Sequence, residues 1–90
     1  MNELYIVCNT HKTVFLADEN HPACDRYGTC VKMEAARVYT SEAKARHAKH
    51  DYNMRMRRRA RAPLHMRIFH VQPRPGFLPK LTEVFEQPIS

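Results

Sequence analysis

The sequence predicts a small α+β domain in two layers, with an antiparallel sheet of three to four strands packed on one long basic helix. Three observations support this prediction. Short runs of β-branched and aromatic residues lie toward both ends of the chain, strong helix formers fill its middle, and 90 residues allow one small domain but not two. We therefore place a single domain at residues 1–72 and a proline-rich C-terminal extension, packed on that domain, at residues 73–90.

The chain begins with a predicted β-hairpin. Residues 4–7 and 13–16 are rich in strand-forming side chains, and a polar stretch separates them. Asn9 suits the turn because its side chain can bond the local backbone and because asparagine tolerates positive φ. Residues 17–30 are expected to form a loop, in which Gly28 takes a backbone conformation that other residues resist.

A third strand is expected within residues 31–39, most clearly over 36–39, where alternate side chains would share a face. A helix is expected from about residue 41 to residue 61, since Thr40 or Ser41 can cap its first turn and strong helix formers follow. Pro63 would end it. The side chains at steps of three and four residues form a narrow apolar stripe that ends in an arginine: Ala45, Ala48, Tyr52, Met56 and Arg59.

The C-terminal third is predicted to hold one more strand, over residues 64–71. An extended segment is expected over residues 72–79, because three prolines interrupt regular structure there. Residues 80–86 are expected to form one or two helical turns, with Leu81, Val84 and Phe85 on one face.

The positive charge is concentrated in one segment. The whole chain carries a net charge of +6, yet the segment from Lys44 to Arg61 alone holds eight basic residues and one acid, a net +7, which leaves −1 for the remainder. The basic residues of the segment are Lys44, Arg46, Lys49, Arg55, Arg57, Arg58, Arg59 and Arg61. The protein is therefore a nearly neutral domain with one very basic segment.

Such a run favours a polyanionic partner, because phosphate backbones neutralise clustered cations by counterion release and arginine adds bidentate hydrogen bonds. Two other interpretations remain open: contact with an acidic protein surface, and a solvated helix face. No base-specific readout is predicted, since neither a helix-turn-helix spacing nor an aromatic RNA-binding motif is present, although Tyr27 could stack on a base. The candidate binding residues are Arg46, Lys49, Arg55, Arg57, Arg58, Arg59 and Arg61.

Two pairs of potential metal ligands stand near the predicted hairpin. Cys8 and His11 bracket its turn, and His21 and Cys24 follow on the loop. Zinc prefers four sulfur and nitrogen ligands that arrive as close pairs, so these four side chains could hold a structural zinc ion. The alternative is that Cys8 packs in the sheet and the histidines face solvent. A disulfide between Cys24 and Cys30 is less favoured, because the cysteine count of three is odd and a cytosolic protein keeps its thiols reduced.

The sequence does not predict catalysis. It contains no glycine-rich phosphate loop and no marked pair of carboxylates, and nothing identifies an activated cysteine. With no long apolar run and no basic, apolar leader, we expect a cytoplasmic protein that uses neither a membrane nor a small-molecule substrate. Apart from the candidate zinc ion, no cofactor is expected. The expected partner is nucleic acid or a host complex that binds nucleic acid.

The junction Ala36-Arg37-Val38-Tyr39-Thr40-Ser41-Glu42-Ala43, with the hairpin before it, resembles small accessory proteins of bacteriophages and other mobile elements. The resemblance covers residues 4–71 and implies a compact, non-enzymatic protein. Many proteins of that kind bind and inhibit host machinery, and anti-CRISPR proteins are among them. The resemblance therefore implies, as an alternative function, the inhibition of a host defence complex, with the basic helix on an acidic protein surface. It assigns no functional residue.

Overall fold

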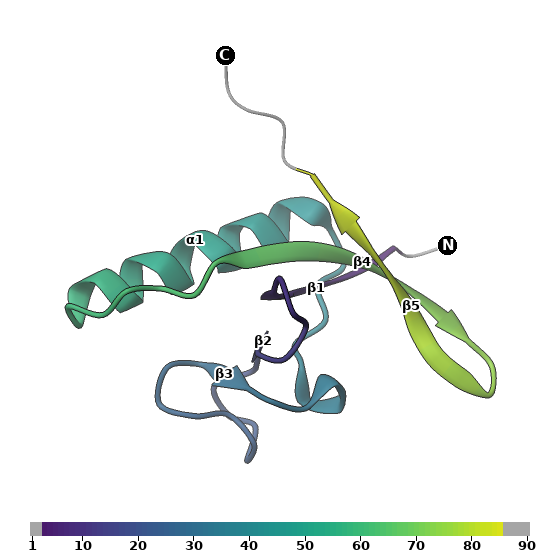
Figure 1. Cartoon of the computed structure of the whole chain (residues 1–90), viewed down its shortest axis with the longest axis horizontal. Helices are drawn as coiled ribbons and strands as arrows, with labels where there is room; N and C mark the ends of the chain where they lie inside the picture. Colours follow the sequence, from purple (N-terminus) through teal and green to yellow (C-terminus); the bar gives the residue numbers. More distant parts are fainter. Residues whose placement is uncertain (1–2, 86–90) are drawn as a thin grey trace.

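The computed structural model describes residues 3–85 and shows a small α+β domain built on a five-stranded antiparallel sheet (Figure 1). The strands are β1 (Leu4–Asn9), β2 (Phe15–Leu16), β3 (Thr29–Cys30), β4 (Met66–Arg74) and β5 (Phe77–Val84), in the spatial order β3-β2-β1-β4-β5. The helix α1 (Glu42–Arg58) and a short 3₁₀ helix, η1 (Met33–Ala35), complete the described part. The predicted class is confirmed, but the sheet has one or two strands more than expected.

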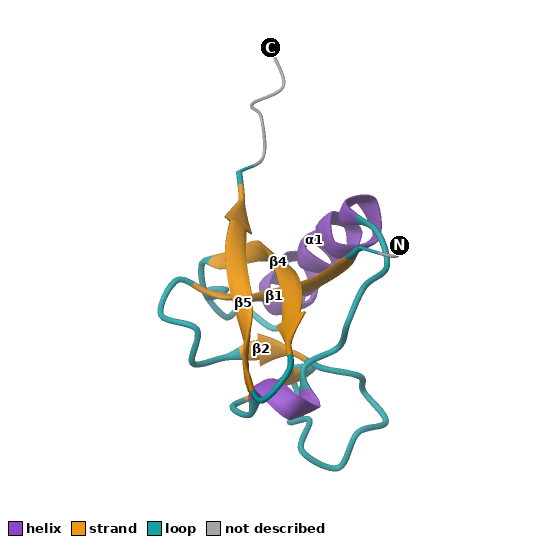
Figure 2. Ribbon diagram, turned by 90° about the vertical axis from the view of Figure 1, so that its right-hand side faces the viewer, coloured by secondary structure: helices purple, strands orange, loops and turns teal. Residues whose placement is uncertain are grey.

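The sheet carries a hydrophobic cluster on each face. In register, Val7 of β1 faces Ile68 of β4, and both pack with the buried α1 side chains Tyr52 and Met56. The neighbouring pair, Ile6 and Phe69, belongs to the second cluster. Figure 2 shows α1 on one side of β1 and β4. The second cluster is closed by the loop segment that contains η1, through Cys24, Cys30, Met33, Ala35 and Ala36.

The predicted N-terminal hairpin is confirmed. β1 pairs with the short β2, and Cys8 faces Phe15. The side chain of Asn9 organises the turn, because its Oδ1 accepts hydrogen bonds from the backbone N–H groups of Thr13 (2.8 Å) and Val14 (3.0 Å). Lys12 takes the positive φ, at 58°.

The strand predicted over residues 31–39 is wrong. Residues 33–35 form η1 instead, and only two isolated bridges follow, between Ala36 and Ala17 and between Tyr39 and Tyr5. The strand prediction relied on Ala36 and Val38 sharing one face of the sheet, yet the Val38 side chain is half exposed. The segment crosses from one sheet face to the other, so it contacts a strand at each end without running alongside either.

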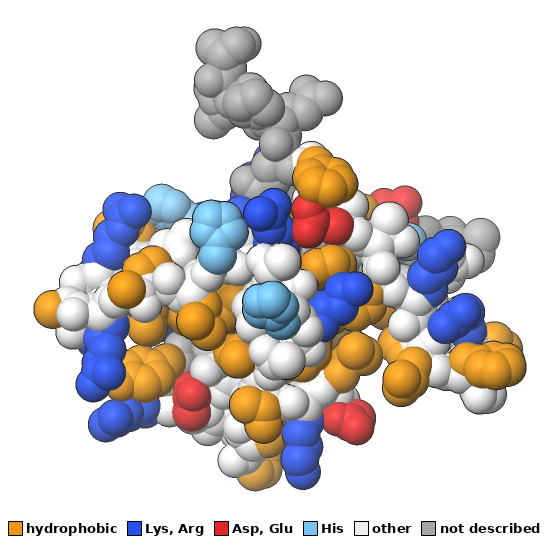
Figure 3. Space-filling view, viewed as in Figure 1, with side chains coloured by type: hydrophobic (Ala, Val, Ile, Leu, Met, Phe, Trp, Pro, Cys, Tyr) orange, Lys and Arg blue, Asp and Glu red, His pale blue; other side chains and the backbone are white. Residues whose placement is uncertain are grey.

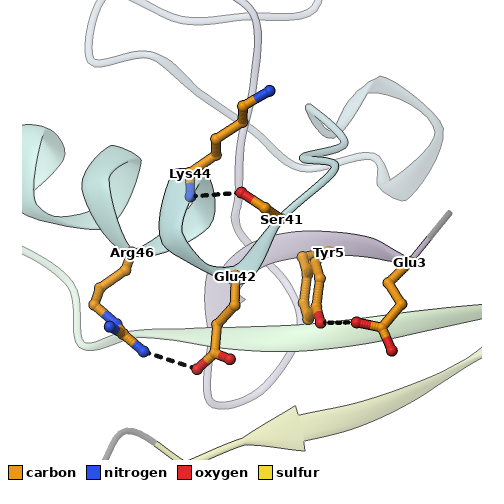
Figure 4. Close-up of polar contacts among 6 residues, drawn as sticks. All are labelled: Glu3, Tyr5, Ser41, Glu42, Lys44 and Arg46. Atoms are coloured by element: carbon orange, nitrogen blue, oxygen red, sulfur yellow. Dashed lines mark hydrogen bonds and ion pairs between the residues drawn. The ribbon is translucent and has the colours of Figure 1, made fainter.

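The predicted helix is confirmed, but it ends earlier than expected. Of the two candidate caps, Ser41 is the N-cap: its Oγ accepts a hydrogen bond from the backbone N–H of Lys44 at 3.1 Å (Figure 4). Ala45, Tyr52 and Met56 are buried, as the stripe predicts. The helix stops at Arg58, three residues before the expected end at residue 61, because Ala60 adopts a left-handed φ of 54°.

The C-terminal prediction of helical turns at residues 80–86 is wrong within the described residues. Residues 77–84 form β5, which pairs along β4, for example Val71 with Leu81. The prolines are compatible with these strands because of where they lie. Pro73 lies beyond Val71, the last β4 residue that pairs with β1, so it does not interrupt the β1–β4 hydrogen bonds. Pro79 belongs to β5, an edge strand that has a partner on one side only. Residue 86 lies outside the described residues.

Among residues 3–85, no helix combines the length and the apolar character that crossing a bilayer requires.

Candidate polyanion-binding site

The C-terminal end of α1 meets the loop of residues 25–29, which lies about 30 residues earlier in the chain. The Nη2 atom of Arg55 donates a hydrogen bond to the backbone carbonyl of Tyr27 at 3.2 Å. The Nη1 atom of Arg59 donates one to the carbonyl of Arg26, also at 3.2 Å. Two arginines of the basic segment thus fasten the loop to the end of the helix.

The loop itself is held by Asp25. Its Oδ1 accepts hydrogen bonds from the backbone N–H groups of Tyr27 (2.8 Å) and Thr29 (3.0 Å), and its Oδ2 accepts one from the Thr29 hydroxyl (2.8 Å). Partial burial acts to raise the pKa of Asp25, but these hydrogen bonds outweigh it and hold the pKa below its ordinary value. Gly28 completes the turn with a φ of 79°, which confirms its predicted role.

The ring of Tyr27 lies among three guanidinium groups. The Cζ atoms of Arg26, Arg59 and Arg61 lie 5.1, 5.5 and 5.7 Å from the ring centroid, within the range of cation–π attraction. Together with Arg55, which bonds the Tyr27 carbonyl, these residues form what we call the arginine cluster: Arg26, Arg55, Arg59 and Arg61 around Tyr27. The aromatic ring and two carbonyl oxygens position the cations but do not neutralise them.

Within the described part of the chain, no ion pair joins a carboxylate to the arginine cluster. Within residues 3–85, the ion pairs of arginine join Arg46 to Glu42 (2.8 Å; Figure 4) and Arg67 to Glu83 (3.5 Å), and none joins a member of the cluster. The space-filling view shows Lys and Arg side chains gathered at the edge where Figure 1 places the C-terminal end of α1 (Figure 3). The cluster therefore concentrates positive charge and is suited to a multivalent anion, although the Asp25 carboxylate attracts Arg26 electrostatically and Arg55 shares a pocket with carboxylates.

The structure divides the predicted binding residues. It brings Arg55, Arg59 and Arg61 together in the cluster. Arg46 lies about 13 Å earlier along the helix axis than Arg55, nine residues at 1.5 Å each. Lys49 is partly buried, whereas Arg57 and Arg58 are exposed on other sides of α1.

Sequence reasoning missed Arg26 as a site residue. It is an isolated arginine in a loop, far from the basic run, and its only local signal is the adjacent Tyr27. Tyr27 itself is predicted from the sequence as an aromatic that could stack on a base.

A pocket of about 210 Å³ is lined in part by Arg55 and by Gly28. Its charged lining residues have both signs, with Arg37 and Arg55 opposed by three carboxylates, Asp18, Glu19 and Asp51. The anion-binding character of the arginine cluster therefore does not extend into this pocket.

The four predicted zinc ligands lie in different surroundings. Cys8 is fully buried in β1, and burial raises the pKa of its thiol to about 11. His11 is exposed, and the Nδ1 atom of His21 accepts a hydrogen bond from the backbone N–H of Ala23 (3.0 Å). Cys24 is partly buried with its Sγ 3.4 Å from the Asp25 carbonyl. Over residues 3–85, no three side chains of His, Cys, Asp or Glu gather as a metal site, and all three cysteines are free thiols, so zinc binding stays a prediction.

Comparison of the chain with protein-family models, with curated proteins and with solved structures finds no significant match.

Proposed function

We propose that this protein is a non-catalytic nucleic-acid-binding protein whose arginine cluster contacts the phosphate backbone. The observation that carries the proposal is the gathering of Arg26, Arg59 and Arg61 within 6 Å of the Tyr27 ring, with no carboxylate paired to any of them among residues 3–85. Mutual repulsion of these cations is a cost of folding that a bound polyanion removes.

Nucleic acid suits this site by its charge and by the hydrogen-bond acceptors of its phosphates. Each guanidinium can bind a phosphate through two parallel hydrogen bonds, and each neutralised phosphate releases counterions, which favours binding most at low salt. The loop hydrogen bonds of Asp25 hold the site in place before the ligand arrives, so little ordering is required on binding. The resemblance to accessory proteins of mobile elements is compatible with a nucleic-acid-bound host complex as the target.

The test is a fluorescence anisotropy titration of labelled oligonucleotides at two or more salt concentrations. We expect the logarithm of the affinity to fall linearly with the logarithm of the salt concentration. In the double variant R59Q/R61Q the affinity should fall at least tenfold at low salt, and the salt slope should become shallower by about one unit for each lost phosphate contact.

The matched control is K32Q/K80Q, which removes the same charge from two exposed lysines outside the arginine cluster. If the control weakens binding as much as R59Q/R61Q does, net charge rather than the cluster is responsible. If the unchanged protein binds no oligonucleotide at micromolar concentration, nucleic-acid binding is wrong, and the inhibition of a host complex through an acidic protein surface becomes the better hypothesis.

A further inference from the structure

The exposed half of α1 has a crest without lysine, arginine or acidic side chains. At about 100° per residue, the buried side chains Ala45, Tyr52 and Met56 define the side of α1 that faces the sheet. The opposite side, which we call the crest, is formed by four exposed residues: Ala43, His47, His50 and Met54. The crest runs from residue 43 to residue 54, and the last turn of α1 beyond it carries Arg57 and Arg58.

Cations flank the crest on both sides. One flank carries Arg46 and Arg57, both exposed, and the Arg46 guanidinium is paired with the Glu42 carboxylate at 2.8 Å. The other carries Lys44 and Arg58, and it continues into the arginine cluster through Arg55. One acid, Asp51, lies on this second flank, with its carboxylate 3.7 Å from His47.

We propose that α1 lies in the major groove of double-stranded DNA, with the crest toward the base edges and the two flanks on the phosphates of opposite strands. This inference rests on the proposed function and specifies its ligand. Two separate rows of cations match two separate phosphate backbones, whereas a single strand needs one row. The 17 residues of α1 make a helix about 25 Å long and about 10–12 Å across, a size that the major groove of B-form DNA, about 12 Å wide, admits.

The side chains of the crest suit this position. The histidines can donate to or accept from base edges, and Ala43 and Met54 can contact the methyl group of thymine. Double-stranded RNA does not fit in the same way, because the major groove of its A-form helix is too narrow and too deep for a helix to enter. The proposal therefore predicts that the protein binds duplex DNA more tightly than duplex RNA of the same charge.

The first experiment compares one sequence of 20 base pairs as duplex DNA, as duplex RNA and as single-stranded DNA, by anisotropy at a fixed salt concentration. Duplex DNA should bind at least tenfold more tightly than either alternative. Methylation of guanine N7, which blocks the major groove, should weaken binding, whereas a ligand that occupies the minor groove should not displace the protein. Equal or tighter binding of the single strand or of duplex RNA would overturn the major-groove proposal while leaving nucleic-acid binding intact.

The second experiment tests the two flanks separately. R46Q/R57Q alters one flank, K44Q/R58Q alters the other, and K32Q/K80Q is the control of equal charge, with circular dichroism to confirm that each variant folds. Both flank variants should weaken duplex binding at least fivefold and make the salt slope shallower, and the control should change affinity less than twofold. An effect confined to K44Q/R58Q would instead mean that the ligand contacts only the side of the arginine cluster, and would contradict the proposal.

The third variant acts on the crest alone. His50→Glu places a carboxylate against the acceptor-rich base edges and should weaken duplex binding at least tenfold. Gln72→Glu is its control, because it adds the same charge to the β4–β5 hairpin opposite Lys80. If H50E binds the duplex as well as Q72E does, the crest does not face the groove. Loss of all binding in the unchanged protein would instead refute the proposed function itself.

Discussion

Gly28 is the residue at which backbone conformation and the candidate site are most closely coupled. Its φ of 79° lies in the left-handed region, and a Cβ atom at this position would lie 2.7 Å from the Nη2 atom of Arg55. That nitrogen donates the hydrogen bond to the Tyr27 carbonyl. A side chain at position 28 would therefore strain the turn and also displace an arginine of the cluster.

Gly28→Ala should lower the free energy of unfolding by about 1–2 kcal/mol, through the left-handed backbone, and should also weaken oligonucleotide binding. Urea unfolding and anisotropy measure the two effects. Gly76→Ala is the matched control, because Gly76 also has a positive φ (73°) but a Cβ there meets nothing within 4 Å. G76A should therefore lose stability without losing affinity; equal losses of affinity in both variants would argue against a specific role of Arg55.

At the scale of the element, the end of α1 decides how the basic segment is displayed. Continuous helix to residue 61 would carry Arg59 and Arg61 around the axis with the other arginines. Instead, the N–H groups of Arg59, Ala60 and Arg61 turn back to carbonyls of residues 55–57, and the chain leaves the helix with Ala60 in the left-handed region. This early end places Arg59 and Arg61 beside Tyr27.

Ala60→Gly should stabilise the protein by about 1 kcal/mol, because glycine takes the left-handed conformation after a helix without the steric cost that alanine has there. Thermal or urea unfolding checks this prediction. Ala62→Gly, two residues further along and without a positive φ, is the control and should not stabilise the fold. A destabilised A60G would mean that the helix continues past residue 60 in solution.

The element scale also shows why the C-terminal prediction was wrong. The spacing of Leu81, Val84 and Phe85 fits a helical face, but over so short a window it fits a strand as well. The long edge of β4 resolves the ambiguity, because residues 77–84 pair antiparallel with β4 residues 68–74 through backbone hydrogen bonds. Pairing with the preceding strand across the turn at residues 75–76 thus overrides a weak local preference.

At the scale of the whole molecule, the small core contains groups that keep their protons to higher pH in the folded chain than in the unfolded chain. Burial raises the pKa of Cys8 from its ordinary 9.0 to about 11, and burial also raises the pKa of Tyr39. Above pH 9 the unfolded chain loses the Cys8 proton while the folded chain keeps it.

The contribution of Cys8 to the free energy of unfolding should therefore be constant below about pH 9 and should be lost as the pH rises from about 9 to about 11. For this one proton the free energy of unfolding should fall by at most about 1.4 kcal/mol per pH unit. Urea midpoints measured across this range provide the test. Cys8→Ala should be less stable at neutral pH, because it leaves a cavity in the core, but its stability should fall less steeply with rising pH. An equally steep fall would assign the effect to other groups.

The sequence by itself determined the α+β class, the N-terminal hairpin, the start of the helix and the concentration of charge in one segment. Each of these depends on neighbours within a few residues: strand-forming runs around Asn9, a capping serine before strong helix formers, and a count of basic side chains. Only the tertiary structure decided that Arg26 joins the basic segment, that Ala60 ends the helix, and that residues 77–84 add a strand. The first outcome depends on a contact between residues 33 apart in the chain, and no local pattern encodes which distant loop the end of a helix will meet. The other two involve neighbouring residues, but there the local sequence also favours helix, so the hydrogen bonds that close α1 and the pairing along β4 decide between the alternatives.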